Sequence, residues 1–324
     1  MVEPVQQFDV ISMGRIGVDL HPHRPGVPGP RHGSSGRFLG GPAADVAVTA
    51  ARLGCSTAVI TRTGADSFGA YLHQTLTESG VDNRWVTRTA ASATPVAGAP
   101  DLEIHTDELD YFAIRAARIF WITGTGLSAE PSRSATLAAL KCRDRTATTV
   151  LELDWRPAPG DDPARTDPDE PRPHYARAPR QAYAEARPHH AEALRHAYAE
   201  ALRHAYAEAL RHAYAEALRH ATVAVGDLDA CEIATGVRAP HACAEALLAA
   251  GVELAVVKRG PQGVLAVHRD GTTADVPSAP VAAVDGAGDG FGGALCHGLL
   301  SGWELERTVR HALTAGTPLD GALR

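Results

Sequence analysis

The alternation of two kinds of segment constrains the fold of this 324-residue chain more than any other feature. Runs of consecutive apolar, often β-branched residues predict strands over 8–13, 58–61, 119–123, 149–153, 222–225 and 254–258. Segments with helical periodicity, several of them closed by glycine, predict helices over 42–53, 67–79, 131–140 and 241–250. Strands that are apolar on both faces, in regular turn with helices, indicate an α/β domain with a doubly wound, mostly parallel sheet and helices on both faces.

In open sheets of this class, ligands bind beyond the carboxyl ends of the strands. Small or charged residues fall where four of the predicted strands end: Gly14, Asp154, Gly226 and Lys258. Because parallel strands end at the same edge of a sheet, we expect these four positions to border a ligand site.

A glycine-rich segment, 284–295, is the clearest candidate for chemistry. Its small residues lead into Asp289, and Phe291 and Leu295 follow at helical spacing. A loop of this kind that opens a helix presents unpaired N–H groups to an anion, and glycines let the backbone approach a phosphate closely. An aspartate there suits a base that takes a proton from a hydroxyl attacking that phosphate. The stretch alone fits equally well a glycine-rich turn with an acidic N-cap.

Composition narrows the function classes. The formal net charge is -7, with no basic stripe, which argues against nucleic acid as a partner. The five cysteines have no C-x-x-C spacing, so we interpret them as reduced thiols and expect neither a disulfide framework nor a zinc site. No apolar run approaches the ~20 residues of a membrane span, and the N-terminus does not resemble a signal peptide, so we expect a cytoplasmic protein.

Residues 157–220 interrupt the rhythm of strands and helices. The first part, 157–188, is rich in Pro, Asp and Arg and is interpreted as an irregular linker. The octapeptide His-Ala-Tyr-Ala-Glu-Ala-Leu-Arg then occurs three times, beginning at His196, His204 and His212. These strong helix formers predict one helix of about 30 residues. Because eight residues overshoot two turns by about 80°, equivalent leucines wind around the helix, so we expect a solvated helix, with a partner-binding helix as the alternative.

Five motifs occur in order along the chain. They are Met13-Gly14-Arg15-Ile16-Gly17-Val18-Asp19, the glycines Gly40, Gly41, Gly54 and Gly64, Asp154-Trp155-Arg156-Pro157, Val257-Lys258-Arg259-Gly260-Pro261-Gln262-Gly263, and Gly286-Ala287-Gly288-Asp289-Gly290-Phe291. Together they resemble the ribokinase (phosphofructokinase-B) family of sugar kinases, and their amino-acid sequences are most similar to those of the 5-dehydro-2-deoxygluconokinases. The resemblance implies a ribokinase-like fold with a kinase domain over 1–156 and 221–324, an insertion over 157–220, and a reduced β lid over about 20–40 and 94–104.

The resemblance also implies a reaction. ATP, with Mg2+, phosphorylates the primary hydroxyl of a sugar acid, and 5-dehydro-2-deoxygluconate, from inositol catabolism, is the first expectation. Asp289 is implied as the base that accepts the hydroxyl proton. The backbone N–H groups of Gly286, Ala287 and Gly288 are implied to stabilise the phosphoryl group during transfer.

Binding residues follow from the same resemblance. The residues implied for the sugar are Asp19, Gly40, Gly41 and Asp45. The residues implied for the nucleotide are Asp227, Lys258, Gly260 and Gly263, and Glu232 is implied for magnesium, through water. Taken without the family order, Asp19 is a loop cap and 260–263 a hairpin turn.

Departures from the family's pattern keep alternatives open. Asp45 stands where the family has Asn, Asp227-Leu228-Asp229-Ala230 stands where it has N-x-x-E, and about two lid strands are missing between Val96 and Ala99. One alternative is a degenerate relative that binds sugar or nucleotide weakly without turnover. Others are a kinase for another sugar, such as 2-keto-3-deoxygluconate or ribose, and an interaction protein built on the repeat helix. A homodimer formed through the lid also stays open.

Overall fold

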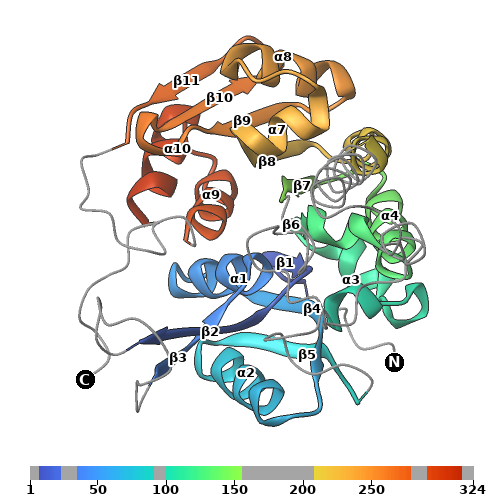
Figure 1. The fold of residues 1–324 in the computed structure, drawn as a ribbon. Coiled ribbons are helices and arrows are strands. Elements are labelled where there is room, and N and C mark those ends of the chain that lie inside the picture. The colour runs from blue at the N-terminus through green and yellow to red at the C-terminus, as the bar shows by residue number, and fades with distance from the viewer. Residues whose placement is uncertain (1–6, 23–34, 91–99, 155–207, 279–289, 316–324) are drawn as a thin grey trace, which may run out of the picture.

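The computed structural model describes residues 7–22, 35–90, 100–154, 208–278 and 290–315 (Figure 1). The centre of this part is a nine-stranded sheet with the order β11-β10-β9-β8-β7-β6-β1-β4-β5. Its strands are β1 (Val10–Met13), β4 (Thr57–Gly64), β5 (Val81–Thr89), β6 (Ile119–Thr123), β7 (Thr148–Leu153), β8 (Val223–Asp227), β9 (Leu254–Lys258), β10 (Val264–His268) and β11 (Thr273–Val276). Strands β1 and β4 to β9 are parallel, and β10 and β11 add an antiparallel hairpin at one side.

Helices cover both faces of this sheet, as predicted (Figure 1). One face carries α1 (Pro42–Arg52), α9 (Phe291–Leu300) and α10 (Leu305–Ala315), with α2 (Ser67–Glu78) beside α1. The other carries α3 (Tyr111–Ala116), α4 (Ser132–Arg143), a helix over 208–218, α7 (Leu228–Thr235) and α8 (Pro240–Ala250). Successive residues of a strand point to opposite faces of the sheet, so they pack into two hydrophobic cores. Trp121 packs in the core between the sheet and α9, whereas Phe120 and Ile122 pack in the core on the other face. Within the described residues, none of the helices combines the length and apolar character that a bilayer crossing requires.

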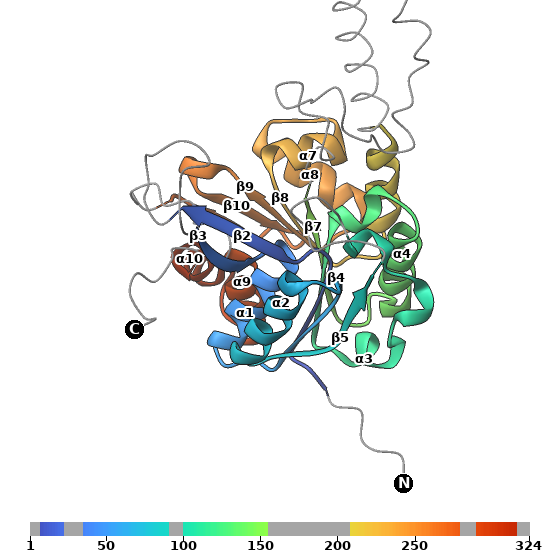
Figure 2. The ribbon, with the colours of Figure 1, turned by 60° about the horizontal axis from the view of Figure 1, so that its bottom comes forward.

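A separate two-stranded antiparallel sheet, β2 (Gly17–Pro22) and β3 (Ser35–Gly40), follows β1 and lies next to α1 and α2 (Figures 1 and 2). Its register places Gly17 opposite Gly40. Residues 23–34, between the two strands, and 91–99 lie outside the described part. The bounds expected for the lid, the kinase domain and the insertion therefore stay predictions.

Four short 3-10 helices complete the described elements: η1 (Pro100–Glu103), η2 (Thr106–Glu108), η3 (Gly124–Ser128) and η5 (Gly260–Gln262). Of these, η1 packs against β4 and η3, and η3 directly follows β6. Because β1 lies between β4 and β6 in the sheet, η1 sits over the carboxyl end of β1.

The last part of the octapeptide repeat is buried on one side, so the expectation of a solvated helix is wrong over 208–218. Leu210, Ala213, Tyr214, Ala217 and Leu218 are all buried. Their spacing of three, four, seven and eight residues places them on one face, and Tyr214 fills the arc between the two leucines. The drift of about 80° between equivalent leucines stays within an apolar face that is ≳100° wide. The linker and the first repeat copy lie outside the described residues.

Candidate functional site

The carboxyl ends of the parallel strands bring together charged side chains from three neighbouring strands. Glu152 and Asp154 come from the end of β7, Asp227 from the end of β8 and Lys258 from the end of β9. Gly14 follows β1 with a φ of 141°, and a Cβ there would clash with the Thr123 hydroxyl at the end of β6. The strand ends predicted to border a ligand therefore do share one edge of the sheet.

Lys258 is a fixed cation at this edge. Its Nζ donates to Glu152 Oε1 over 3.3 Å, and Trp121 Nε1 donates to the other Glu152 oxygen over 3.2 Å. Burial alone would lower the pKa of Lys258, but Glu152 and, beyond it, Asp227 and Asp154 raise the pKa above its ordinary value. The ammonium group therefore stays charged across the physiological pH range, with its side chain still 31% exposed.

Asp227 stands opposite Lys258 in the pairing of β8 with β9. It is also the N-cap of α7, because its Oδ1 accepts the N–H of Ala230 over 2.7 Å. Glu232, one turn further along α7, forms an ion pair of 2.5 Å with Arg238. The structure thus brings Asp227 and Lys258 together and directs the Glu232 carboxylate to Arg238.

The two glycines predicted for the nucleotide lie in the turn between β9 and β10. Gly260 opens η5 with a φ of 57°, and no atom of the described residues lies within 4 Å of a Cβ built on it. Gly263 has a φ of 86°, and a Cβ there would clash with the carbonyl of Val276. The hairpin itself therefore requires glycine at 263, whereas Gly260 leaves open space just after Lys258.

The four residues predicted for the sugar meet where β2, β3 and α1 join. A Cβ on Gly40 would clash with the Asp19 carboxylate. Gly41 has a φ of 99° and precedes α1, and the N–H of Asp45 donates to the Gly41 carbonyl over 3.0 Å. Glycine at 40 therefore leaves the space in which the Asp19 side chain lies.

Sequence reasoning missed a buried carboxyl group near this junction. Asp101, in η1, is only 3% exposed, and its Oδ1 has no hydrogen-bond partner among the described residues. Burial raises its pKa to about 6, the charge of Arg15 opposes that rise, and the charge of Asp154 adds to it. A lone aspartate in an aperiodic segment carries no sequence signal, whereas Glu152 stands out as a charged residue inside an apolar strand.

The residues predicted for catalysis, Gly286, Ala287, Gly288 and Asp289, lie outside the described residues. The helix predicted to follow them is present as α9, which begins at Phe291. It packs closely, since a Cβ on Gly292 would come within 2.9 Å of the Trp121 ring. The first turn of α9 therefore rests on the side chain whose N–H binds Glu152.

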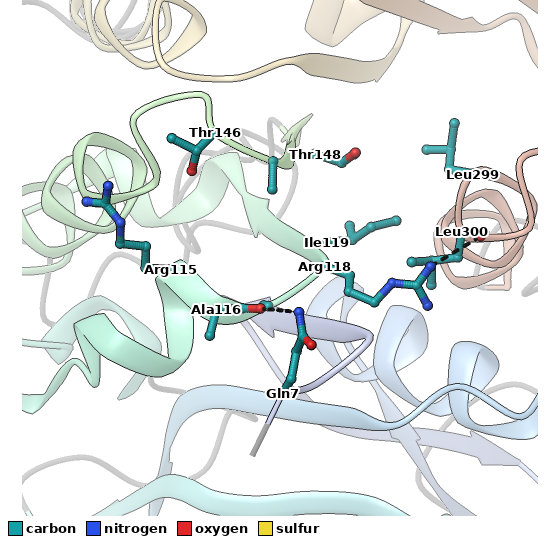
Figure 3. Close-up of a pocket in the computed structure, with 11 residues that line it drawn as sticks. Gln7, Arg115, Ala116, Arg118, Ile119, Thr146, Thr148, Leu299 and Leu300 are labelled. Atoms are coloured by element: carbon teal, nitrogen blue, oxygen red, sulfur yellow. Dashed lines mark hydrogen bonds between the residues drawn. The ribbon is translucent and has the colours of Figure 1, made fainter. Parts of the chain in front are cut away.

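A pocket of about 570 Å³ lies at the opposite edge of the sheet, at the amino ends of β1, β6 and β7 (Figure 3). Gln7, Arg118 and Leu300 are among the residues that line it. Gln7 donates to the Ala116 carbonyl, and Arg118 donates to the Leu300 carbonyl. None of the residues predicted for sugar, nucleotide or catalysis lines this pocket. No group of three His, Cys, Asp or Glu side chains in the described ranges is arranged to hold a metal ion.

The sequence is similar to two proteins named 5-dehydro-2-deoxygluconokinase. The one from Shouchella clausii is 25% identical, with 94% of this chain and 87% of that protein covered. The one from Photobacterium profundum is 27% identical, with 95% and 87% covered.

A solved structure shares the fold. It is a protein from E. coli, provisionally named ribokinase II, in complex with ATP and Mg2+. The two structures superpose with a TM-score of 0.72 at 20% sequence identity, over 95% of this chain and 91% of the other. The sequence itself matches the pfkB family carbohydrate kinases over residues 8–99 and 183–317. The chain is therefore a carbohydrate kinase of the pfkB family.

Proposed function

We propose that this carbohydrate kinase uses ATP to phosphorylate the primary hydroxyl of a sugar acid, and that 5-dehydro-2-deoxygluconate is its substrate. The observation that carries the proposal is that two relatives aligned over nearly the whole chain bear that name. The described edge of the sheet supports it, because Asp19 and Gly40 form one group of residues and Asp227 and Lys258 form another. Two separate groups are what a reaction between a sugar and a nucleotide requires.

In the proposed reaction, the oxygen of the primary hydroxyl attacks the γ-phosphorus of ATP and the bond to the bridging oxygen of ADP breaks. Asp289 accepts the hydroxyl proton. The N–H groups of 286–288 stabilise the negative charge of the phosphoryl group in transfer. Asp19 and Asp45 accept hydrogen bonds from sugar hydroxyls, and Gly40 and Gly41 leave room for the sugar.

On the nucleotide side, Lys258 supplies a positive charge for phosphate, and Gly260 supplies open space beside it. Mg2+ in such sites takes most of its ligands from phosphate oxygens and water, with one or two carboxylates. Asp227 fits that role, because its helix cap occupies one carboxylate oxygen and no hydrogen bond from a described residue occupies the other. When bound, the ion neutralises phosphate charge. Glu232 as a further magnesium residue stays a prediction.

The test is a coupled assay of ADP release over a panel of 5-dehydro-2-deoxygluconate, 2-keto-3-deoxygluconate, ribose and fructose. We expect the highest kcat/KM with the first. Asp289→Asn should lower kcat by ~10²–10⁴, the usual contribution of a general base. Asp270→Asn is the matched control, because Asp270 is exposed in the turn between β10 and β11. Equal activity of Asp289→Asn and wild type contradicts the mechanism, and binding of sugar and ATP without turnover supports the degenerate alternative.

A further inference from the structure

Among the described residues, Arg15 is a cation without a carboxylate partner on the sugar side of the site. It follows β1, is half-buried, and no salt bridge joins it to any carboxylate in the described part of the chain. Its backbone is fixed, because its carbonyl accepts the N–H of Ala43 over 3.2 Å and a Cβ on Gly41 would come within 2.7 Å of the same oxygen. The guanidinium group therefore starts from a rigid position beside the Gly40–Gly41 turn.

Asp101 is the buried counterpart of this cation. The charge of Arg15 acts on the Asp101 carboxyl group, yet the two side chains form no salt bridge. One oxygen of Asp101 is buried with no described hydrogen-bond partner, and leaving a buried acceptor unpaired costs about 1–3 kcal/mol. A cation with no described ion pair that acts on a buried acceptor with no described hydrogen bond suits a site that a ligand completes.

The position of Arg15 in the sheet points to the sugar rather than to the nucleotide. β1 and β9 are separated by β6, β7 and β8, so the strand ends that carry Arg15 and Lys258 are about 19 Å apart at roughly 4.8 Å per strand. The carboxylates on this side of the site are Asp101, which interacts electrostatically with Arg15, and Asp19 and Asp45, which belong to the junction of β2, β3 and α1. A sugar acid that entered this group would meet repulsion unless a cation faced its carboxylate.

We propose that the Arg15 guanidinium binds the carboxylate of the sugar acid, and that Asp101 is the positioning residue that keeps the guanidinium on the sugar side of the site. This inference rests on the proposed function, since it requires a substrate that carries a carboxylate. The guanidinium group suits this role because it presents paired N–H donors that match the two oxygens of a carboxylate. Arg15 thereby selects sugar acids over neutral sugars.

The test compares Arg15→Gln and Arg15→Lys with wild type, using 5-dehydro-2-deoxygluconate as the acid and ribose and fructose as neutral sugars. We expect Arg15→Gln to raise the KM for the acid at least tenfold, with kcat within threefold and with the KM for ATP and for neutral sugars unchanged. Arg15→Lys should recover part of the loss, because it keeps the charge without the paired donors. Arg52→Gln is the control, since Arg52 is exposed in the last turn of α1.

Each other result is decisive. An equal loss on acid and neutral sugars, a rise in the KM for ATP instead, or no change overturns the inference, and so does a wild type that phosphorylates only neutral sugars. If wild type turns over no sugar, calorimetric titration with the acid separates the two proposals. Binding that Arg15→Gln abolishes sustains the role of Arg15 while the kinase activity fails, and absence of binding to wild type overturns both.

Discussion

Lys258 and Glu152 join the ends of two strands that are not neighbours, because β8 lies between β9 and β7. Trp121 connects this pair to α9: its N–H donates to the second oxygen of Glu152, and its ring packs against Gly292 in the first turn of α9. Glu152, at the end of the central strand β7, thus fixes the position of Lys258, the cation that we propose for the nucleotide.

Removing the charge of Glu152 should destabilise the fold. Glu152→Gln keeps the size of the side chain and an acceptor for Trp121 but leaves Lys258 without its closest anion. We expect the free energy of unfolding to fall by about 2 kcal/mol, less than for a fully buried pair, since Lys258 is 31% exposed. Urea denaturation measures this change. Glu306→Gln, which breaks an exposed pair with Arg310 on α10, should cost no more than ~0.5 kcal/mol. A double-mutant cycle with Lys258→Met that finds no coupling contradicts the prediction.

Asp101 should make the stability of the protein depend on pH. The pKa of Asp101 is raised from 3.8 to about 6, so between these values the folded protein holds a proton that the unfolded chain has lost. The free energy of unfolding therefore falls as pH rises through this window. Asparagine does not ionise, so Asp101→Asn should raise the free energy of unfolding near pH 7.5 by ~1–3 kcal/mol, with little gain near pH 4.

Urea denaturation at the two pH values checks this expectation, with Asp107→Asn, an exposed position in η2, as the control. The same gain at both pH values excludes ionisation of Asp101 as the cause. By the role proposed for Asp101, the stabilised variant should also have a higher KM for the sugar acid.

The helix over 208–218, which packs against the sheet, should contribute to the stability of the protein. Leu218 is 1% exposed in the helix over 208–218, so Leu218→Ala leaves a cavity and should cost about 2–5 kcal/mol. His212→Ala, on the exposed side of the same helix, should change stability by less than ~0.5 kcal/mol. Thermal and urea denaturation of both variants measure the difference. Equal, small effects mean that the segment is detached from the core in solution.

A methyl group at position 40 should weaken binding of the sugar and leave the stability of the fold almost unchanged. Gly40→Ala fits an extended strand, but the new Cβ would meet the Asp19 carboxylate, which is exposed and free to swing aside. We expect a change in unfolding free energy below ~1 kcal/mol together with a rise in the KM for the sugar and an unchanged KM for ATP. Steady-state kinetics with both substrates tests this, and an unchanged KM for the sugar argues against Asp19 as a sugar ligand.

The sequence predicted best those elements whose position is set by burial of apolar side chains alone. The strands expected over 119–123 and 254–258 have those bounds in the structure, because both are apolar on both faces. Strand β5, at the end of the sheet, was missed because it is partly exposed and because polar residues, among them Asn83, Arg84 and Arg88, interrupt its apolar positions. Helix α7 was missed because it begins directly after β8, with Asp227 as its cap and no turn residues between.

The residues of the candidate site likewise fall into those that sequence motifs predicted and those that only the folded chain brings together. Asp19 and Gly40 belong to spaced motifs, so their proximity could be expected from the order of the motifs. Asp101 and Arg15 interact across 86 residues of sequence, through a short helix with no periodicity, and only the folded chain brings them together. The approach of Glu152 to Lys258 likewise depends on strand order, which the alternation of elements leaves undetermined.

The buried face of the helix over 208–218 has a consequence for how the chain tolerates change in length. Every full octapeptide copy supplies the same alanines, tyrosine and leucine in the same order, and the buried residues come from the copy joined to β8 together with Leu210 at the end of the copy before it. Gain or loss of a whole copy further upstream therefore leaves identical residues against the sheet. If the number of copies changes, we therefore expect the length of the protein to change in steps of eight residues while the side chains that pack against the sheet stay the same.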